Sequence, residues 1–166
     1  LAQGTKITIG GLCGTGKGSV SKILSERFGY SLMSAGGFFR SFAKEEGVPL
    51  AVIEERAKTD PKYDKWVDDR TCDFGYENNH FVFEGRLAWY FIDGVNILLP
   101  CSFGKRVQRI AERDGLTISE ALQATESRED AAVVRYAKYY NILDINDPRH
   151  YTFMVDTTDI SAVEVA

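Results

Sequence analysis

The residues from Ile9 to Ser19 have the types and spacing that bind phosphate groups. They read Ile-Gly-Gly-Leu-Cys-Gly-Thr-Gly-Lys-Gly-Ser, so that four residues separate Gly11 from the pair Gly16-Lys17. In a P-loop of this spacing the glycines let backbone N–H groups turn inward around phosphate oxygens, and the lysine reaches the β- and γ-phosphates. The sequence therefore predicts a binding site for the phosphates of a nucleoside triphosphate, made by Gly11, Leu12, Cys13, Gly14, Thr15, Gly16, Lys17, Gly18 and Ser19.

The position after the lysine departs from the general pattern. Most P-loops place Ser or Thr there to bind magnesium, whereas this chain has Gly18 followed by Ser19. The hydroxyl group is therefore shifted by one residue. Ser19 is the candidate magnesium ligand of the loop.

The segments on either side of the loop agree with this interpretation. Residues 6–9 form an apolar, strand-like run before the loop. Apolar residues then recur at helical spacing from Val20 to Phe28, and Gly29 is placed to end that helix. A strand, a loop and a helix in this order let the positive N-terminus of the helix face the phosphates.

Length and composition restrict the remaining possibilities. A chain of 166 residues with 44% hydrophobic residues suits one domain with one sizeable core. The formal net charge of −4 argues against general binding to nucleic acid, and no apolar run of about 18 residues indicates a membrane span. The three cysteines show no metal-binding spacing. We expect a cytoplasmic protein with no nucleic-acid or membrane partner, and the sequence makes no prediction about its oligomeric state.

The apolar runs predict a single α/β domain over residues 1–166. Five short strand candidates alternate with helices, at residues 6–9, 30–33, 80–83, 96–99 and 151–155. The helices between them are expected to end at Gly29, Gly47, Asp60, Gly75 and Gly115, and a capping box at Thr117-Ile118-Ser119-Glu120 begins a long helix toward Tyr140. This order predicts a three-layer α/β/α sandwich with a five-stranded parallel sheet, the P-loop nucleoside triphosphate hydrolase fold.

A second capping box, Ser161-Ala162-Val163-Glu164, has almost no helix after it. We expect a helix to begin there, in a chain that continues further.

Arginines stand where such a fold gathers its ligands, at the carboxyl ends of the strands. Arg40 follows the second strand, and Glu84-Gly85-Arg86 ends the third. Arg128 and Arg135 are seven residues apart and share one helix face. Arginine matches phosphate geometry well.

Phosphoryl transfer between two nucleotides requires mainly these groups. The two substrates together carry roughly six negative charges near neutral pH, so catalysis consists mostly of charge neutralisation and positioning. An acceptor phosphate with a second pKa of about 6 is already ionised and needs no general base. The chain has only two histidines, His80 and His150, and neither falls in a catalytic pattern.

The chain resembles the short, archaeal-type cytidylate kinases along nearly all of its length. Its Lys-Gly-Ser variant of the P-loop is similar to that of nucleoside monophosphate kinases in general. The stretches that carry the closer resemblance are Gly11 to Ser19, Ser34-Ala35-Gly36-Gly37-Phe38-Phe39-Arg40, Asp60-Pro61 with Asp64 and Asp68, Glu84-Gly85-Arg86-Leu87-Ala88, Arg106-Val107-Gln108-Arg109-Ile110, Arg128-Glu129 with Arg135-Tyr136, and Asp156-Thr157-Thr158.

This resemblance implies a kinase that transfers the γ-phosphate of ATP to CMP, or to dCMP, with Mg²⁺. It implies an acceptor-binding region over residues 37–75 and a mobile lid over residues 113–136. The residues it implies are Lys17, Arg86, Arg128 and Arg135 in catalysis; Arg109 and Arg113 beside the donor nucleotide; Ser34, Gly36, Arg40, Asp68, Arg70, Gly85 and Arg86 at the acceptor; and Ser19 with Glu84, acting through water, near magnesium.

Two departures from the resemblance bear on the base. Gly37 stands where the family usually has an acidic residue, and the insertion that helps bacterial cytidylate kinases read cytosine is absent. The alternatives are a P-loop kinase for another acceptor, such as AMP or a non-nucleotide alcohol, and a nucleotide-binding module without transfer activity. An alcohol would need a general base, for which Asp64 and Asp68 are candidates.

Overall fold

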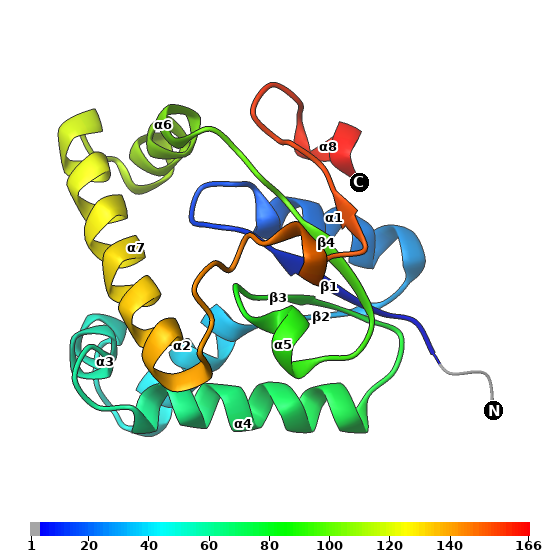
Figure 1. Ribbon diagram of the computed structural model, residues 1–166, viewed down its shortest axis with the longest axis horizontal. Coiled ribbons are helices and arrows are strands. Elements are labelled where there is room, and N and C mark those ends of the chain that lie inside the picture. The colour runs from blue at the N-terminus through cyan, green and yellow to red at the C-terminus, as the bar shows by residue number, and fades with distance from the viewer. Residues whose placement is uncertain (1–3) are drawn as a thin grey trace.

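Five parallel strands form one sheet at the centre of the molecule. The computed structural model describes residues 4–166, and its strands follow the order β2-β3-β1-β4-β5 (Figure 1). Their bounds are β1 Lys6–Gly10, β2 Ser31–Ser34, β3 Phe81–Glu84, β4 Val95–Leu98 and β5 Phe153–Met154. The predicted fold class is therefore confirmed. The last strand is shorter than the predicted residues 151–155, because this edge strand pairs with β4 through two residues alone.

Helices occupy most of the chain between the strands. Their bounds are α1 Lys17–Phe28, α2 Ala35–Glu45, α3 Leu50–Ala57, α4 Lys62–Glu77, α5 Ala88–Phe91, α6 Phe103–Asp114, α7 Ile118–Tyr140 and α8 Ala162–Val165, with a 3₁₀ turn at Pro148–His150. The short α5 and the 3₁₀ turn were not predicted, because neither is long enough to show a helical period. Both predicted capping boxes, Thr117 with Glu120 and Ser161 with Glu164, are present.

Glycines end three of the predicted helices but not a fourth. Gly29 and Gly115 adopt left-handed conformations, with φ of 66° and 67°, directly after α1 and α6, and Gly47 does so with φ of 67° just after α2. Gly75, by contrast, lies inside α4, which continues to Glu77. A Cβ at Gly75 would come within 2.9 Å of Ile92 Cγ1. This glycine is there for close packing, and the prediction that it ends the helix was wrong.

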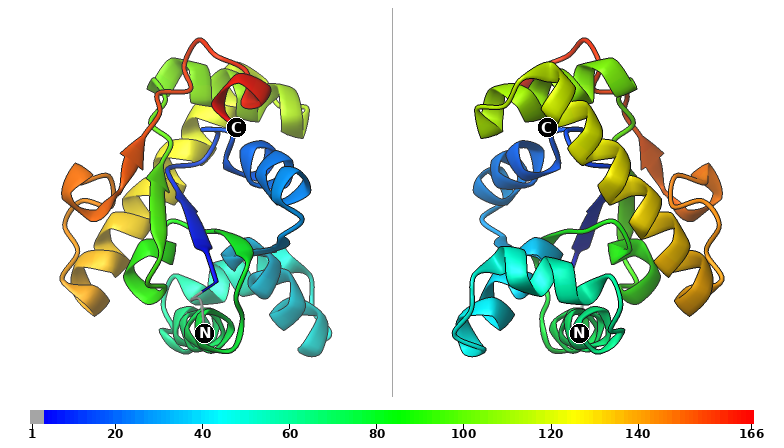
Figure 2. Two further views of the ribbon diagram at one scale, coloured as in Figure 1. Left: turned by 90° about the vertical axis from the view of Figure 1, so that its right-hand side faces the viewer. Right: turned by 90° about the vertical axis from the view of Figure 1, so that its left-hand side faces the viewer.

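The core follows the two-residue period of the strands. On one face, Ile7, Ile9 and Val82 pack against Val20 and Leu24 of α1. On the other face, Phe81 and Phe83 pack against α5, with partly buried side chains from α2 and α4 at the edge of the cluster. Helices thus cover both faces of the sheet, and Figure 2 shows α1 and α7 on opposite sides of it. No helix within residues 4–166 combines the length and apolar character needed to cross a membrane.

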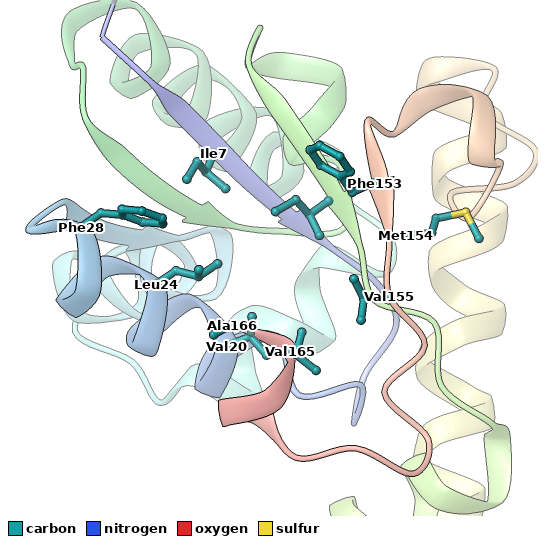
Figure 3. A pocket seen from close by; sticks show the side chains of 10 residues that line it. Ile7, Val20, Leu24, Phe28, Phe153, Met154, Val155, Val165 and Ala166 are labelled. Carbon is teal, nitrogen blue, oxygen red and sulfur yellow. The ribbon is translucent and has the colours of Figure 1, made fainter.

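The face of the sheet next to α1 contains an apolar groove of about 340 Å³ (Figure 3). It runs between α1, the edge strand β5 and the short α8. The residues that line it are Ile7, Val20, Leu24, Phe28, Ile97, Phe153, Met154, Val155, Val165 and Ala166. Phe28 and Phe153 are 55% and 58% exposed there, so this side of the sheet is covered less completely than the other.

The aromatic cluster against β3 should provide a large part of the stability. Phe81 is fully buried, whereas Tyr76, an aromatic residue on α4, is 90% exposed. We expect Phe81→Ala to lower the free energy of unfolding by about 3–5 kcal/mol, because truncation removes apolar contacts and leaves a cavity. Tyr76→Ala should change it by less than about 0.5 kcal/mol. Urea unfolding followed by circular dichroism measures both, and equal effects of the two changes would contradict this account of the core.

Candidate active site

The P-loop lies between the end of β1 and the start of α1. Gly11, Gly14 and Gly16 have φ values of 138°, 80° and 91°, a region that side chains with a Cβ rarely adopt. A Cβ at Gly11 would also lie 2.7 Å from the carbonyl oxygen of Leu99. Gly16 is the N-cap of α1 and provides no side chain for capping, so the first N–H groups of that helix are left for a ligand.

Strand register brings the other predicted residues to the same edge of the sheet. Ile9 of β1 pairs with Glu84 of β3, and Ser34 of β2 pairs with that same Glu84. The ends of three adjacent parallel strands therefore meet beside the P-loop. This placement follows from the pairing order, because β3 lies between β2 and β1.

A cavity of about 630 Å³ opens at this edge. Of the predicted donor and metal residues, those that line it are Cys13, Gly14, Thr15, Gly16, Lys17, Gly18, Ser19, Glu84, Arg109 and Arg113. Gly11 and Leu12 do not line it; Leu12 packs with an apolar cluster that includes Leu87. Sequence reasoning assigned no role to Ile110, Thr157, Ile160, Ser161, Ala162 and Val165, which also line the cavity. The available signals were the matched stretches that contain Ile110 and Thr157, and the capping box that begins at Ser161.

Arg109 connects α6 to the loop that follows β5. Its Nη2 donates to the carbonyl oxygen of Thr157 at 2.6 Å, and Thr157 Oγ1 in turn donates to the carbonyl oxygen of Thr15 at 2.8 Å. Thr157 is almost completely buried. This chain of contacts fixes one wall of the cavity to the P-loop. Arg113 lies further out and pairs with its neighbour Asp114 at 2.7 Å.

Lys17 points back into the loop. Its Nζ donates to the carbonyl oxygen of Leu12 at 2.7 Å. Burial, together with the positive charge of Arg86, lowers the pKa of Lys17 to about 8, against opposing effects of Cys13 and Glu84. The ammonium group is thus poorly solvated in this state, and a bound anion would stabilise its charged form.

Arg86 contacts the P-loop through Cys13. Its Nη2 donates to Cys13 Sγ at 2.8 Å. Burial tends to raise the pKa of the Cys13 thiol, but Arg86, Lys17 and Arg128 together hold it below the usual value. Arg86 is itself mostly buried, and the neighbouring Tyr136 and Cys13 outweigh that burial and raise its pKa, so it stays charged. A permanent positive charge therefore stands directly beside the P-loop.

Ser19 and Glu84 line the same cavity, as expected for two residues near a metal. A Cβ on Gly18 would lie 3.3 Å from Glu84 Oε2, which places this carboxylate over the start of α1. Within residues 4–166 no group of three His, Cys, Asp or Glu side chains could bind a metal by itself. One hydroxyl and one carboxylate instead suit Mg²⁺ that keeps water and phosphate oxygens as its other ligands.

The expected acceptor residues on α2 form a small group at the helix N-terminus. Ser34 Oγ accepts a hydrogen bond from the N–H of Gly37 at 2.9 Å and caps α2. A Cβ on Gly36 would lie 3.5 Å from Arg40 Nη1, so this guanidinium turns back toward the cap. Gly37 occupies the third helical position, where a capping box carries an acidic or amide side chain. Gly85 is buried, and a Cβ on it would meet Ala35 at 3.3 Å.

The helices α4 and α7 are joined by two polar contacts. Arg135 Nε lies 3.1 Å from Asp64 Oδ2, and both side chains are largely buried. The hydroxyl of Tyr140 donates to Asp68. Burial raises the pKa of Asp68 to about 6, although the bond from Tyr140 acts in the opposite direction. Arg135 is therefore ion-paired in this state.

Three further predicted residues, Asp68, Arg70 and Arg128, lie on α4 and α7. Arg70 and Asp68 were both expected at the acceptor, but the guanidinium of Arg70 lies over the ring of Trp66, 4.7 Å from its centroid, on an exposed part of α4. Asp68 instead faces Tyr140 of α7. The two are two residues apart and therefore point to different sides of the helix. This spacing within the predicted helix was a signal, available in the sequence, against a shared contact. Arg128 is exposed on α7, near enough to Cys13 to lower its pKa.

Comparison with known proteins gives relatives of this chain. The profile of a family described as AAA domain matches residues 7–133. The chain is 37% identical to a cytidylate kinase of Methanoregula boonei over 155 residues, which is 92% of this chain and 85% of that protein. It is 36% identical to a cytidylate kinase of Methanocorpusculum labreanum, over 96% of this chain and 91% of that protein.

Solved structures share the same fold at lower identity. Shikimate kinase from Aquifex aeolicus superposes with a TM-score of 0.60 at 17% identity, covering 97% of this chain and 91% of that one. A gluconokinase from Sinorhizobium meliloti gives a TM-score of 0.59 at 19% identity, covering 97% and 86%. These two similarities concern the fold alone.

The lowered pKa of Lys17 predicts proton uptake when ATP binds. Phosphate charge favours the ammonium form, so the pKa of about 8 should rise in the complex. Above about pH 8 binding must therefore take up a proton, and ATP affinity should fall as pH rises further. Titration calorimetry at about pH 9 in buffers of different ionisation enthalpy measures this uptake. Lys17→Arg, which stays charged throughout, is the control; equal uptake in both proteins would disprove the assignment.

The position of Cys13 predicts that a bound nucleotide protects its thiol from alkylation. Cys13 lines the cavity and its pKa is held low, whereas Cys72 is exposed and burial together with nearby aspartates raises its pKa. We expect iodoacetamide near neutral pH to alkylate Cys13 faster than Cys72, because the thiolate is the reacting form. ATP should slow the reaction of Cys13 by about tenfold or more and leave Cys72 unaffected. Peptide mass spectrometry gives both rates, and unprotected Cys13 would show that nucleotides bind elsewhere.

Proposed function

The chain belongs to the cytidylate kinase family of ATP-dependent phosphotransferases, and from this premise we propose that it transfers the γ-phosphate of ATP to CMP, giving ADP and CDP. The observation that carries the proposal is the contact of Arg86 with the P-loop at Cys13, beside Lys17. It keeps two positive charges together beside the P-loop, at the end of adjacent parallel strands, and this supports a site for the phosphates of a donor and an acceptor. CMP is the acceptor that the family relationship favours, with dCMP as a second one.

The donor phosphates would bind to the P-loop. Inward N–H groups and the free N-terminus of α1 provide hydrogen-bond donors, and Lys17 neutralises charge on the β- and γ-phosphates. The nucleoside would extend into the cavity toward Arg109 and Arg113. Arg109 is well suited to a wall of that site, since its bond to Thr157 fixes the direction of the guanidinium.

The acceptor would approach from α2 and α4. Arg40 and Arg86 would bind its phosphate, beside Ser34, Gly36 and Gly85. An ionised phosphate oxygen attacks without a general base. Asp64 and Asp68, the residues that could serve as a base for an alcohol, are engaged by Arg135 and Tyr140.

The transferred phosphoryl group would be stabilised by cations from both sides. Lys17 and Arg86 belong to the core, whereas Arg128 and Arg135 belong to α7. We assign α7 to a lid over residues 113–136 and the acceptor region to residues 37–75. Closure would bring the charge of Arg128 and Arg135 onto the transferring group, where positioned cations lower the barrier.

Magnesium fits beside Ser19 and Glu84. The Ser19 hydroxyl and the Glu84 carboxylate, through water, would hold Mg²⁺ that arrives with ATP. When bound, Mg²⁺ would neutralise negative charge that develops on the phosphates during transfer.

The proposal is tested by ADP formation from ATP and Mg²⁺ across CMP, dCMP, UMP, AMP, GMP and shikimate. We expect CMP to give the highest kcat/KM, because a pocket that pairs with one base leaves buried polar groups unsatisfied with another. Lys17→Met should lower kcat by about a hundredfold or more while the protein stays folded.

Other outcomes would identify the alternatives. A clear preference for AMP would keep the reaction and change the acceptor, whereas a preference for shikimate would indicate an alcohol acceptor. ATP hydrolysis that no acceptor stimulates, in protein that binds ATP, would indicate a nucleotide-binding module. Lys17→Met protein within about threefold of the parent would exclude the P-loop mechanism.

A further inference from the structure

The side chain of Arg106, on α6, joins the P-loop to α7. Its Nη1 donates to the carbonyl oxygen of Cys13 at 3.2 Å. The same guanidinium pairs with Glu129 through both nitrogens, Nη1 with Oε1 and Nη2 with Oε2, the second at 3.3 Å. The Arg106 side chain is 5% exposed and that of Glu129 is 17% exposed. A buried, two-point pair of this kind fixes direction as well as distance.

Arg106 determines which way the peptide between Cys13 and Gly14 faces. All the described peptides are trans, and in a trans peptide the carbonyl and the N–H point in opposite directions. Because the Cys13 carbonyl faces Arg106 on α6, the N–H of Gly14 faces away from α6. A Cβ on Gly14 would lie 2.7 Å from the carbonyl oxygen of Arg106, so the backbones of the loop and α6 are in close contact as well.

Glu129 ties this arrangement to the lid. It follows Arg128 directly in α7, and Arg106 is its ion-pair partner. The pair thus restrains both the P-loop peptide and the helix that carries Arg128. Arg106 was part of the stretches that carry the family resemblance, but the sequence assigned no role to it.

Resting on the phosphotransferase function proposed above, we propose that Arg106 and Glu129 are positioning residues for the donor nucleotide. Glu129 holds the guanidinium of Arg106 against the Cys13 carbonyl, and this keeps the Gly14 N–H directed at the donor phosphates. Neither Arg106 nor Glu129 touches substrate in this scheme.

A positioning role of Glu129 and a purely electrostatic effect of its charge predict opposite changes in ATP affinity when Glu129 is replaced. Glu129 is a negative charge near a site for anions, so its removal should by charge alone strengthen ATP binding. If Glu129 instead orients Arg106, its removal frees the guanidinium and the peptide, and ATP binding should weaken. A pair that only joined α6 to α7 would alter stability without altering the affinity for ATP.

The experiment compares Glu129→Gln with Glu126→Gln. Glu126 is exposed on the same helix, so the control makes the same charge change without touching Arg106. Titration calorimetry with ATP alone should show about tenfold weaker binding for Glu129→Gln and a change within about twofold for Glu126→Gln. Initial rates should show kcat lowered by about tenfold for Glu129→Gln, with the KM for CMP within about twofold of the parent.

Every other result of these measurements supports or overturns the positioning role of Arg106 and Glu129. ATP affinity for Glu129→Gln equal to or tighter than that of the parent would overturn the proposal. If Glu129→Gln does not fold, as thermal unfolding would show, Arg106→Lys decides, because lysine keeps the charge but lacks the two-point fork. A tenfold loss of ATP affinity in Arg106→Lys supports positioning, and parental affinity excludes it. Because binding is measured without acceptor, a parent protein that binds ATP but transfers nothing would refute the proposed function and not this inference.

Discussion

The P-loop backbone can bind phosphate only if its N–H groups point into the cavity while its carbonyl groups find donors elsewhere, and this constraint organises the surrounding side chains. Buried carbonyl groups that lack a donor are costly. Three carbonyl groups of the loop accept side-chain donors from three different parts of the chain, Leu12 from Lys17, Cys13 from Arg106 and Thr15 from Thr157. The loop is therefore held from α1, from α6 and from the segment after β5. Its shape depends on long-range contacts as much as on its glycines.

The same contacts explain how so many cations stand together in a protein with a net charge of −4. A buried charge is tolerated only when it is paired. Arg106 is neutralised by Glu129 and Arg135 by Asp64, while Arg86 rests against Cys13. Lys17 has a carbonyl partner alone, and its lowered pKa reflects this. Of these cations, Lys17 is the one whose charged form bound phosphate would stabilise most.

The arrangement of α4 and α7 bears on the choice of acceptor. Arg135 and Tyr140 of α7 contact Asp64 and Asp68 of α4, so polar groups join these two helices. A phosphate would compete with Asp64 for Arg135 and needs no base to attack, whereas an alcohol would need one of these carboxylates to be free. The family relationship favours the first of these acceptors, a nucleoside monophosphate.

The sequence by itself determined the P-loop, the α/β order of elements and the arginines at the strand ends. These are local or periodic features: glycine spacing, apolar runs and caps such as Thr117 with Glu120 depend on neighbours along the chain. Only the tertiary structure decided that Gly75 packs against Ile92 instead of ending α4, and that Asp68 contacts Tyr140 of α7. It alone revealed Arg106 with Glu129, 23 residues apart, and Thr15 with Thr157, 142 residues apart. Such pairs form because strand order and helix packing bring distant residues together, and no spacing within the chain records that approach.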